Sequence, residues 1–238
     1  MKPRKESSRL PAVGLVLLAT MAALVTSCGD EPKSPASPKL STTPATPGTP
    51  ASYPPETTDW DVAGSLTGSA KESAQFAAET EAKRLRFLAA NDFSTDLLNS
   101  YNERVIAAHK VTKYDWAGWH VGIPSTGGEL VRATSSTPAA NGQEITLCEF
   151  NTPGEFSVVD GHLKTEPEMP NARVIGASTV TVEETTQPSG TNSSYTKTPR
   201  MLIVAFGYID KRDAVNQCDK FAPEPFIQAT PSPTSHPK

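Results

Sequence analysis

The amino-acid sequence predicts an α+β domain in which helices come first and an antiparallel sheet follows. Apolar side chains recur at helical spacing between residues 69 and 109. From residue 131 to residue 211 the pattern changes to β-rich runs that are separated by turn signals. Pro, Ser and Thr dominate on both sides of residues 60–221, so we expect one folded domain between two disordered segments.

The helical half opens with a capping box, Ser69-Ala-Lys-Glu72, and continues to Ala90 in residues that favour helices. Asn91-Asp92 ends this run, and a second helix is expected to start at Ser94 or Asp96 and to reach His109. One stripe should face the core; it consists of Ala70, Ala74, Ala77, Glu81, Leu85 and Leu88.

The β-rich half predicts six strand segments. Residues 131–135 and 144–150 are two of them, and residues 156–164 form a hairpin around an Asp-Gly turn. Residues 174–186 and 195–211 flank a polar loop, and we expect them to pair as a long hairpin.

The N-terminus reads as an export signal. Basic residues precede an apolar run at 11–25, which is too short to span a membrane as a mature helix. The run ends in Leu24-Val-Thr-Ser-Cys28, which resembles the lipobox of bacterial lipoproteins. The resemblance implies cleavage after Ser27 and a diacylglyceryl anchor on Cys28, which would hold the chain at the extracytoplasmic side of the cell membrane. The alternatives are an ordinary cleavable signal and an uncleaved signal anchor.

These features divide the chain into four parts. A lipoprotein signal occupies residues 1–27, and residues 28–59 form a Pro/Ser/Thr-rich spacer that favours extended polyproline II. The single α+β domain occupies 60–221, and residues 222–238 form a Pro-rich tail that is expected to be disordered.

The net charge of the chain argues against several classes of binding partner. The chain carries a net charge of −4, and removal of residues 1–27, with four basic side chains and one acidic one, leaves −7. An acidic chain without basic clusters argues against nucleic acid as a partner and against membrane binding through a basic face. We expect no metal and no cofactor, because no CxxC pair, ligand-spaced histidines, P-loop or Rossmann fingerprint occurs.

The order of elements resembles the NTF2-like/SnoaL-like fold, and more narrowly exported lipoproteins of actinobacteria without an assigned activity. The residues that carry the resemblance are Gly118, His120-Val-Gly-Ile-Pro124, Cys148, Phe156 and Cys218. The resemblance implies helices packed on a curved antiparallel sheet that closes into a cone. That fold hosts both enzymes and non-catalytic modules, so it does not by itself define a function.

Cys148 and Cys218 remain once Cys28 is lipidated, and an exported protein favours a disulfide between them. Two buried free thiols, or a nucleophilic cysteine, are the alternatives.

Aromatic and imidazole groups gather between the two halves, where Tyr101, Trp116, Trp119 and His120 are candidate pocket residues. One interpretation is core and hinge packing. The other is the mouth of a cone that holds an apolar ligand, in which Asp115 and His120 could form an acid–base pair.

The sequence therefore predicts a lipid-anchored cell-envelope protein with a non-catalytic binding or interaction domain. Its partner would be an envelope protein or an apolar small molecule, in an oligomeric state that the sequence does not define. The alternatives are a small hydrolase or isomerase that uses the pocket, and a carrier of apolar molecules.

Overall fold

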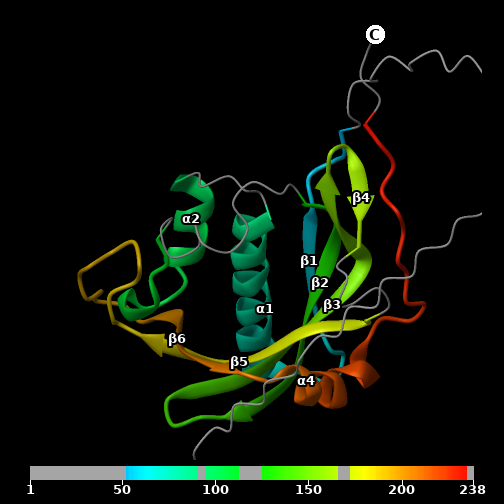
Figure 1. The fold of residues 1–238 in the computed structure, drawn as a ribbon. Helices are drawn as coiled ribbons and strands as arrows, with labels where there is room; N and C mark the ends of the chain where they lie inside the picture. Colours follow the sequence, from blue (N-terminus) through cyan, green and yellow to red (C-terminus); the bar gives the residue numbers. More distant parts are fainter. Residues whose placement is uncertain (1–51, 90–94, 113–124, 166–171, 235–238) are drawn as a thin grey trace, which may run out of the picture. The chain divides into compact units, whose positions relative to one another are not determined.

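The computed structural model of the protein describes residues 52–89, 95–112, 125–165 and 172–234. Within these ranges the elements are arranged as Figure 1 shows. In chain order they are β1 (Thr57–Val62), α1 (Gly68–Ala89), α2 (Thr95–Asn102), a 3₁₀ turn (Ala107–His109), β2 (Ser125–Pro138), β3 (Gly142–Val159), β4 (His162–Lys164), β5 (Val174–Thr185), β6 (Arg200–Tyr208), α4 (Lys211–Cys218) and a second 3₁₀ turn (Asp219–Phe221).

The α+β class is confirmed, but the sheet is mixed and not wholly antiparallel. Its order is β1-β2-β3-β5-β6, with β4 paired to β3. β1 runs parallel to β2, from the pair Thr57 and Gly128 to the pair Val62 and Ala133, while the other strands pair antiparallel. A parallel pair needs a long crossover connection, and here α1 lies within it.

The strongest local patterns of the sequence match the observed elements. α1 spans almost the predicted residues, and the Asp-Gly hairpin forms between β3 and β4, with positive φ angles of 53° at Asp160 and 74° at Gly161. β5 and β6 pair as expected. β3 is longer than predicted, because it continues from Gly142 to Val159 without a break.

The bounds predicted for the second helix and for the last strand were wrong. α2 ends at Asn102, because Val105 and Ile106 instead make isolated β-bridges to Ile203 and Ser189. The last predicted strand was to reach residue 211, but β6 ends at Tyr208.

The main core lies between α1 and the inside of the curled sheet (Figure 1). The fully buried side chains that α1 contributes to this core are all alanines, whose small size lets the helix axis approach the strands closely. Alternation along each strand sends every second side chain to this core. Its members are Ala74, Ala77, Ala78, Ala82, Tyr101, Val105, Val131, Ala133, Ile145, Leu147, Val180, Val182 and Ile203.

A second, smaller core lies on the other face of the sheet, under α4. Cys148 and Cys218 form a disulfide there, with their Cα atoms 5.8 Å apart, and it joins β3 to the last residue of α4. Phe150 and Val174 pack beside it, together with Ala214 of the helix. The sheet is therefore covered by helices on both faces.

Packing of the described residues extends past both ends of residues 60–221. β1 begins at Thr57, and Thr126 Oγ1 donates a hydrogen bond to the Pro54 carbonyl at 2.7 Å. At the other end, Ala229 N donates to the Pro153 carbonyl at 2.6 Å, and Phe226 packs against the second core. A Pro-rich segment can lie against a sheet without regular secondary structure of its own, because proline lacks only the backbone donor.

Among the described residues, no helix combines the length and the hydropathy that crossing a membrane requires.

Candidate functional site

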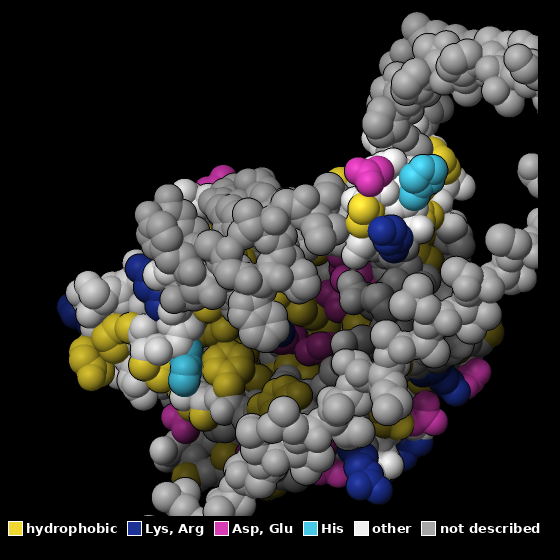
Figure 2. Space-filling view, in the orientation of Figure 1, with side chains coloured by type: hydrophobic (Ala, Val, Ile, Leu, Met, Phe, Trp, Pro, Cys, Tyr) yellow, Lys and Arg dark blue, Asp and Glu magenta, His cyan; other side chains and the backbone are white. Residues whose placement is uncertain are grey.

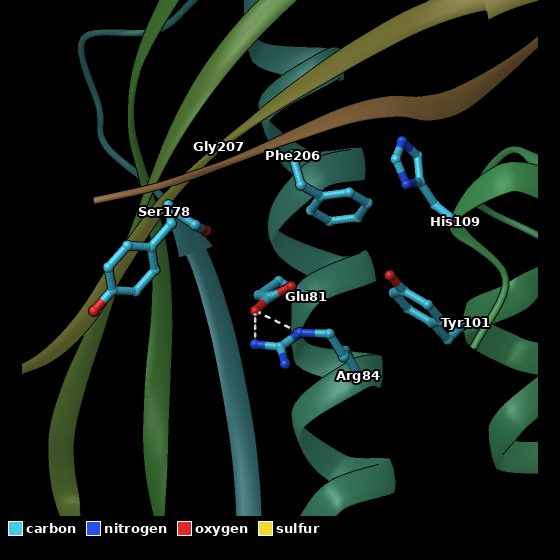
Figure 3. A pocket seen from close by; sticks show the side chains of 8 residues that line it. Glu81, Arg84, Tyr101, His109, Ser178, Phe206 and Gly207 are labelled. Carbon is cyan, nitrogen blue, oxygen red and sulfur yellow. Dashed lines mark hydrogen bonds and ion pairs between the residues drawn. The ribbon is translucent and has the colours of Figure 1, made fainter. Parts of the chain in front are cut away.

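A pocket of about 380 Å³ opens between α1, α2 and the ends of β5 and β6. Figure 3 shows Glu81 and Arg84 reaching into it from α1, while Phe206, His109 and Tyr101 lie together on one side. Helical spacing places Glu81 and Arg84 on one face of α1, and strand alternation places Phe206 and Tyr208 on one face of β6. The described lining residues are Glu81, Arg84, Tyr101, His109, Ser178, Phe206, Gly207 and Tyr208.

The pocket contains a buried ion pair. Glu81 is only 2% exposed, and its Oε1 accepts hydrogen bonds from both Nε, at 2.8 Å, and Nη2 of Arg84. Because burial removes both groups from water, each depends on the other to offset its lost hydration. The pair is thus fixed in place.

Glu149 approaches the same pair from β3. Burial, followed by the negative charge of Glu81, raises the pKa of Glu149 to about 7, while Arg84 acts in the opposite direction. A hydrogen bond to Glu81 favours the protonated form as well. Glu149 therefore carries a proton for much of the time at neutral pH, and it can give up that proton with little change in pH.

Glycine at position 176 makes room for this carboxyl group. Gly176 lies opposite Glu149 in the ladder between β3 and β5. A Cβ atom at position 176 would come within 2.4 Å of Glu149 Oε2. A side chain at position 176 would therefore force the Glu149 carboxyl group to move from its observed place.

Two further glutamates with raised pKa values lie on β2 and just before β1. Glu129 of β2 is 5% exposed and accepts a hydrogen bond from Thr58 Oγ1 at 3.3 Å. Burial, and then the charges of Glu149, Glu56 and Glu155, raise its pKa well above the ordinary value. The pKa of Glu56 rises to about 7 through burial and the charge of Glu155.

We call this set the carboxylate row; its members are Glu81, Glu149, Glu129, Glu155 and Glu56. Its groups influence one another electrostatically, and Arg84 is the guanidinium that acts on Glu149 and pairs with Glu81. Figure 2 shows acidic side chains within a hollow of the surface, with hydrophobic side chains beside them.

The aromatic side of the pocket is partly open to solvent. The rings of His109 and Phe206 meet edge to face with their centroids 5.1 Å apart, and His109 Nε2 lies 3.0 Å from the Val204 carbonyl oxygen. Phe206 is 40% exposed and Tyr208 86%, whereas Tyr101 is buried. Burial, and then the charge of Glu81, raise the pKa of Tyr101, so its hydroxyl stays protonated and can donate a hydrogen bond.

Ser178 lies at the pocket wall and carries a buried hydroxyl group. Ser178 Oγ is buried and makes no hydrogen bond within the described part of the chain. Buried polar groups are nearly always hydrogen-bonded, so an atom of this kind at a pocket wall is suited to contact a bound ligand.

The structure describes one of the four predicted pocket residues and not the other three. Tyr101 lies at the pocket wall. Trp116, Trp119, His120 and Asp115 lie outside the described residues, as does Cys28.

Sequence reasoning missed the charged groups in the pocket and next to it. Two signals were available: Glu81 interrupts the apolar stripe of α1, and Glu149 follows Ile145 and Leu147 on the same face of β3. A charged residue at a core position is itself a sign of a paired or functional group.

No metal-binding group appears in the described ranges, because no set of three or more His, Cys, Asp or Glu side chains converges there. The geometry gives a pocket with an aromatic opening and a charged interior, a composition common among small-molecule sites. Comparisons of the chain with protein-family models, curated proteins and solved structures find no match.

Proposed function

We propose that this protein is a lipid-anchored protein of the cell envelope whose domain binds a small ligand in the pocket between α1, α2 and β6. The observation that carries the proposal is the pocket itself. Its volume of about 380 Å³ falls within the range of known ligand sites, roughly 300–1,000 Å³. Aromatic rings at an opening, with a few fixed polar groups inside, are the usual composition of such sites.

The lipid anchor rests on the sequence. Leu24-Val-Thr-Ser-Cys28 follows a basic and then apolar leader, as lipoprotein processing requires. Each buried CH₂ group contributes about 0.8 kcal/mol, so two acyl chains on Cys28 would hold the protein stably at the membrane. The residues between Cys28 and the packed segment that begins near Pro54 would then act as a tether.

We also infer that the domain belongs to the NTF2-like type. Support comes from α1 lying inside a curled sheet (Figure 1), with a pocket that residues of α1, α2, β5 and β6 line. On this view the pocket corresponds to the mouth of the cone.

Native mass spectrometry of the mature chain, purified from its own membrane in mild detergent, tests the binding function. We expect an added mass that leaves on activation. Phe206→Ala should weaken recapture of that molecule by about tenfold, because it removes one wall of the pocket. The matched control is Tyr195→Ala, which removes a 74% exposed ring from the loop between β5 and β6. A chain without added mass, or equal losses in both variants, would refute the proposal.

Cys28→Ala tests the anchor. We expect the variant to leave the membrane fraction, because no acyl chain can be attached. Fractionation of cells with an antibody to the domain measures this, and Cys148→Ala with Cys218→Ala serves as a control that leaves Cys28 intact. Retention of the Cys28→Ala chain in the membrane fraction at the wild-type level would contradict lipidation.

A second candidate is a small pocket enzyme, a hydrolase or an isomerase. One observation favours it: a carboxyl group with a pKa of about 7 beside an ion-paired carboxylate is suited to general acid–base catalysis. If the molecule released from the pocket is chemically altered on incubation with fresh protein, the pocket is catalytic. If it is recovered unchanged, the domain is a binding module or carrier.

A further inference from the structure

We propose that Ser178 determines the specificity of the pocket by hydrogen-bonding the hydroxyl or carbonyl group of an uncharged ligand, whose aromatic or apolar body lies against the rings of β6. The inference rests on the proposed function, because it names the chemistry of the ligand that the pocket would bind. Its basis is that Ser178 lines the pocket with a buried hydroxyl oxygen that makes no hydrogen bond to the described residues.

The sheet directs Ser178 towards the inner side of the molecule. Successive side chains of a strand point to opposite faces, and Ser178 lies two residues before Val180, a member of the main core. Its partner across the ladder to β3 is Leu147, which belongs to the same core. Ala177, the preceding residue, packs in the second core on the other face. Ser178 therefore continues the inner face of β5 to the place where the pocket begins.

The fold alone does not explain a serine at this position. Val180 and Val182 follow it on the same face of β5 and are apolar. A hydroxyl group that is buried without a hydrogen bond costs free energy, which an apolar side chain at the same place would not. Within the described ranges nothing repays that cost. A ligand group in the pocket would repay it, because a serine hydroxyl can both donate and accept a hydrogen bond.

The Ser178 hydroxyl can be reached by way of Tyr208. The two residues are paired across the ladder between β5 and β6, which places their side chains next to each other on one face. Tyr208 is 86% exposed, so few contacts hold its ring, and exposed side chains change rotamer within nanoseconds. A ligand that moves this ring aside reaches Ser178, and the ring can then close over the ligand.

The charges in the pocket favour an uncharged ligand. Glu81 and Arg84 both line it and are bound to each other through Nε and Nη2 of the guanidinium. An ammonium group would have to take Glu81 from Arg84, and a carboxylate would have to take Arg84 from Glu81. Either exchange leaves one buried charge unpaired, which is strongly unfavourable. An exposed aromatic ring adds less to the binding of a cation than a broken pair of this kind loses.

Aromatic rings at the opening provide a surface for the body of the ligand. Phe206 and Tyr208 lie two residues apart on β6 and so share one face of the strand. The Phe206 ring is held from the side by His109, edge to face with the centroids 5.1 Å apart (Figure 3). Its face is thus available for stacking against a flat apolar molecule.

Equilibrium dialysis of the mature chain in micelles of a nonionic detergent, against identical micelles without protein, tests the inference at pH 7. The probes share a naphthalene ring and are measured by its fluorescence: 2-naphthalenemethanol, 2-methylnaphthalene, 2-naphthylmethylamine and 2-naphthoate. At equal aqueous concentration we expect the alcohol to bind at least about tenfold more tightly than either ion. The hydrocarbon should bind more weakly than the alcohol, because it leaves the Ser178 hydroxyl without a partner.

Ser178→Ala should weaken binding of the alcohol by about fivefold and leave binding of the hydrocarbon unchanged. Its urea unfolding midpoint should equal or exceed that of the wild type, because it loses no hydrogen bond to the described residues. Ser193→Ala, at an exposed position in the loop between β5 and β6, is the matched control and should behave as the wild type.

The inference is overturned if the wild-type chain binds either ion as tightly as the alcohol. It also fails if Ser178→Ala weakens the alcohol and the hydrocarbon equally, or weakens neither. A Ser178→Ala chain that unfolds more readily than the wild type would contradict it too, since the hydroxyl would then serve the fold.

Failure of the broader proposal gives a different result. If no probe binds and native mass spectrometry finds no bound molecule, the pocket is not a ligand site. If no probe binds but a molecule co-purifies, an uncharged molecule with a hydroxyl or carbonyl group supports the inference, and an ionic one overturns it.

Discussion

Replacing both Cys148 and Cys218 with alanine will lower the free energy of unfolding by about 3–4 kcal/mol. The disulfide spans a sequence separation of 70 residues, so its loss releases much conformational entropy in the unfolded chain. Both residues are also fully buried in the second core, where Phe150 packs. Urea unfolding of the wild type and the double variant measures the difference.

Reducing agent provides the internal control for this experiment. It should destabilise the wild type by a similar amount and leave the double variant unchanged, since that variant has no disulfide to lose. A loss below about 1 kcal/mol would mean that α4 and β3 are held together without the covalent link.

Replacing Arg84 with methionine will lower the free energy of unfolding by about 3–5 kcal/mol at pH 8, and by less at pH 5. Methionine keeps much of the side-chain volume but leaves the buried Glu81 without its cation. Acid reduces this loss, because Arg84 also acts on Glu149, whose raised pKa leaves it protonated and without need of a counter-charge at pH 5. Chemical denaturation at both pH values measures it.

The sign of the pH dependence follows from the direction of the shift at Glu149. Its pKa is raised in the folded protein, so between about 4.5 and 7 the native state holds more protons than the unfolded state. Stability contributed by this group is therefore present at low pH and declines as pH rises towards 7. Removal of Arg84 should make that decline steeper.

The exposed Arg212 on α4 is the matched control for Arg84. Arg212→Met should change the free energy of unfolding by no more than about 0.5 kcal/mol at either pH. Equal effects of the two substitutions, or a larger loss for Arg84→Met at pH 5 than at pH 8, would contradict the role assigned to the ion pair.

The sequence allowed the local elements to be predicted better than their assembly. α1 and the hairpin between β3 and β4 follow from a run of helix-favouring residues and an Asp-Gly turn, which act over a few residues. β1 was missed, although Thr58, Trp60 and Val62 alternate with two aspartates, because a six-residue edge strand resembles the end of a polar spacer.

α4 was missed for a related reason. It is short and mostly polar, and Ala214 and Cys218, one turn apart, are its buried residues. Its start does carry a signal, since the Asp210 side chain accepts hydrogen bonds from the backbone N–H groups of Arg212 and Asp213. Asp210 lies inside residues 195–211, which the sequence pattern predicts to be a strand, so this signal was overlooked.

The site could be predicted only in part. Tyr101 was found through the aromatic cluster, but the meeting of Glu81 with Glu149 depends on how α1 sits across β3, which no local pattern encodes. Gly176 is similar, because its role is visible only once β5 is paired to β3 in the observed register.

The most direct test of the account is a crystal structure of the full chain, purified from its own membrane with its bound material retained. We expect electron density for a small molecule in the pocket, in contact with Phe206 and Tyr101 and with a polar group near Glu81. A pocket filled by side chains of the protein itself, or by water alone after such gentle purification, would contradict the claim that this domain is a ligand-binding module.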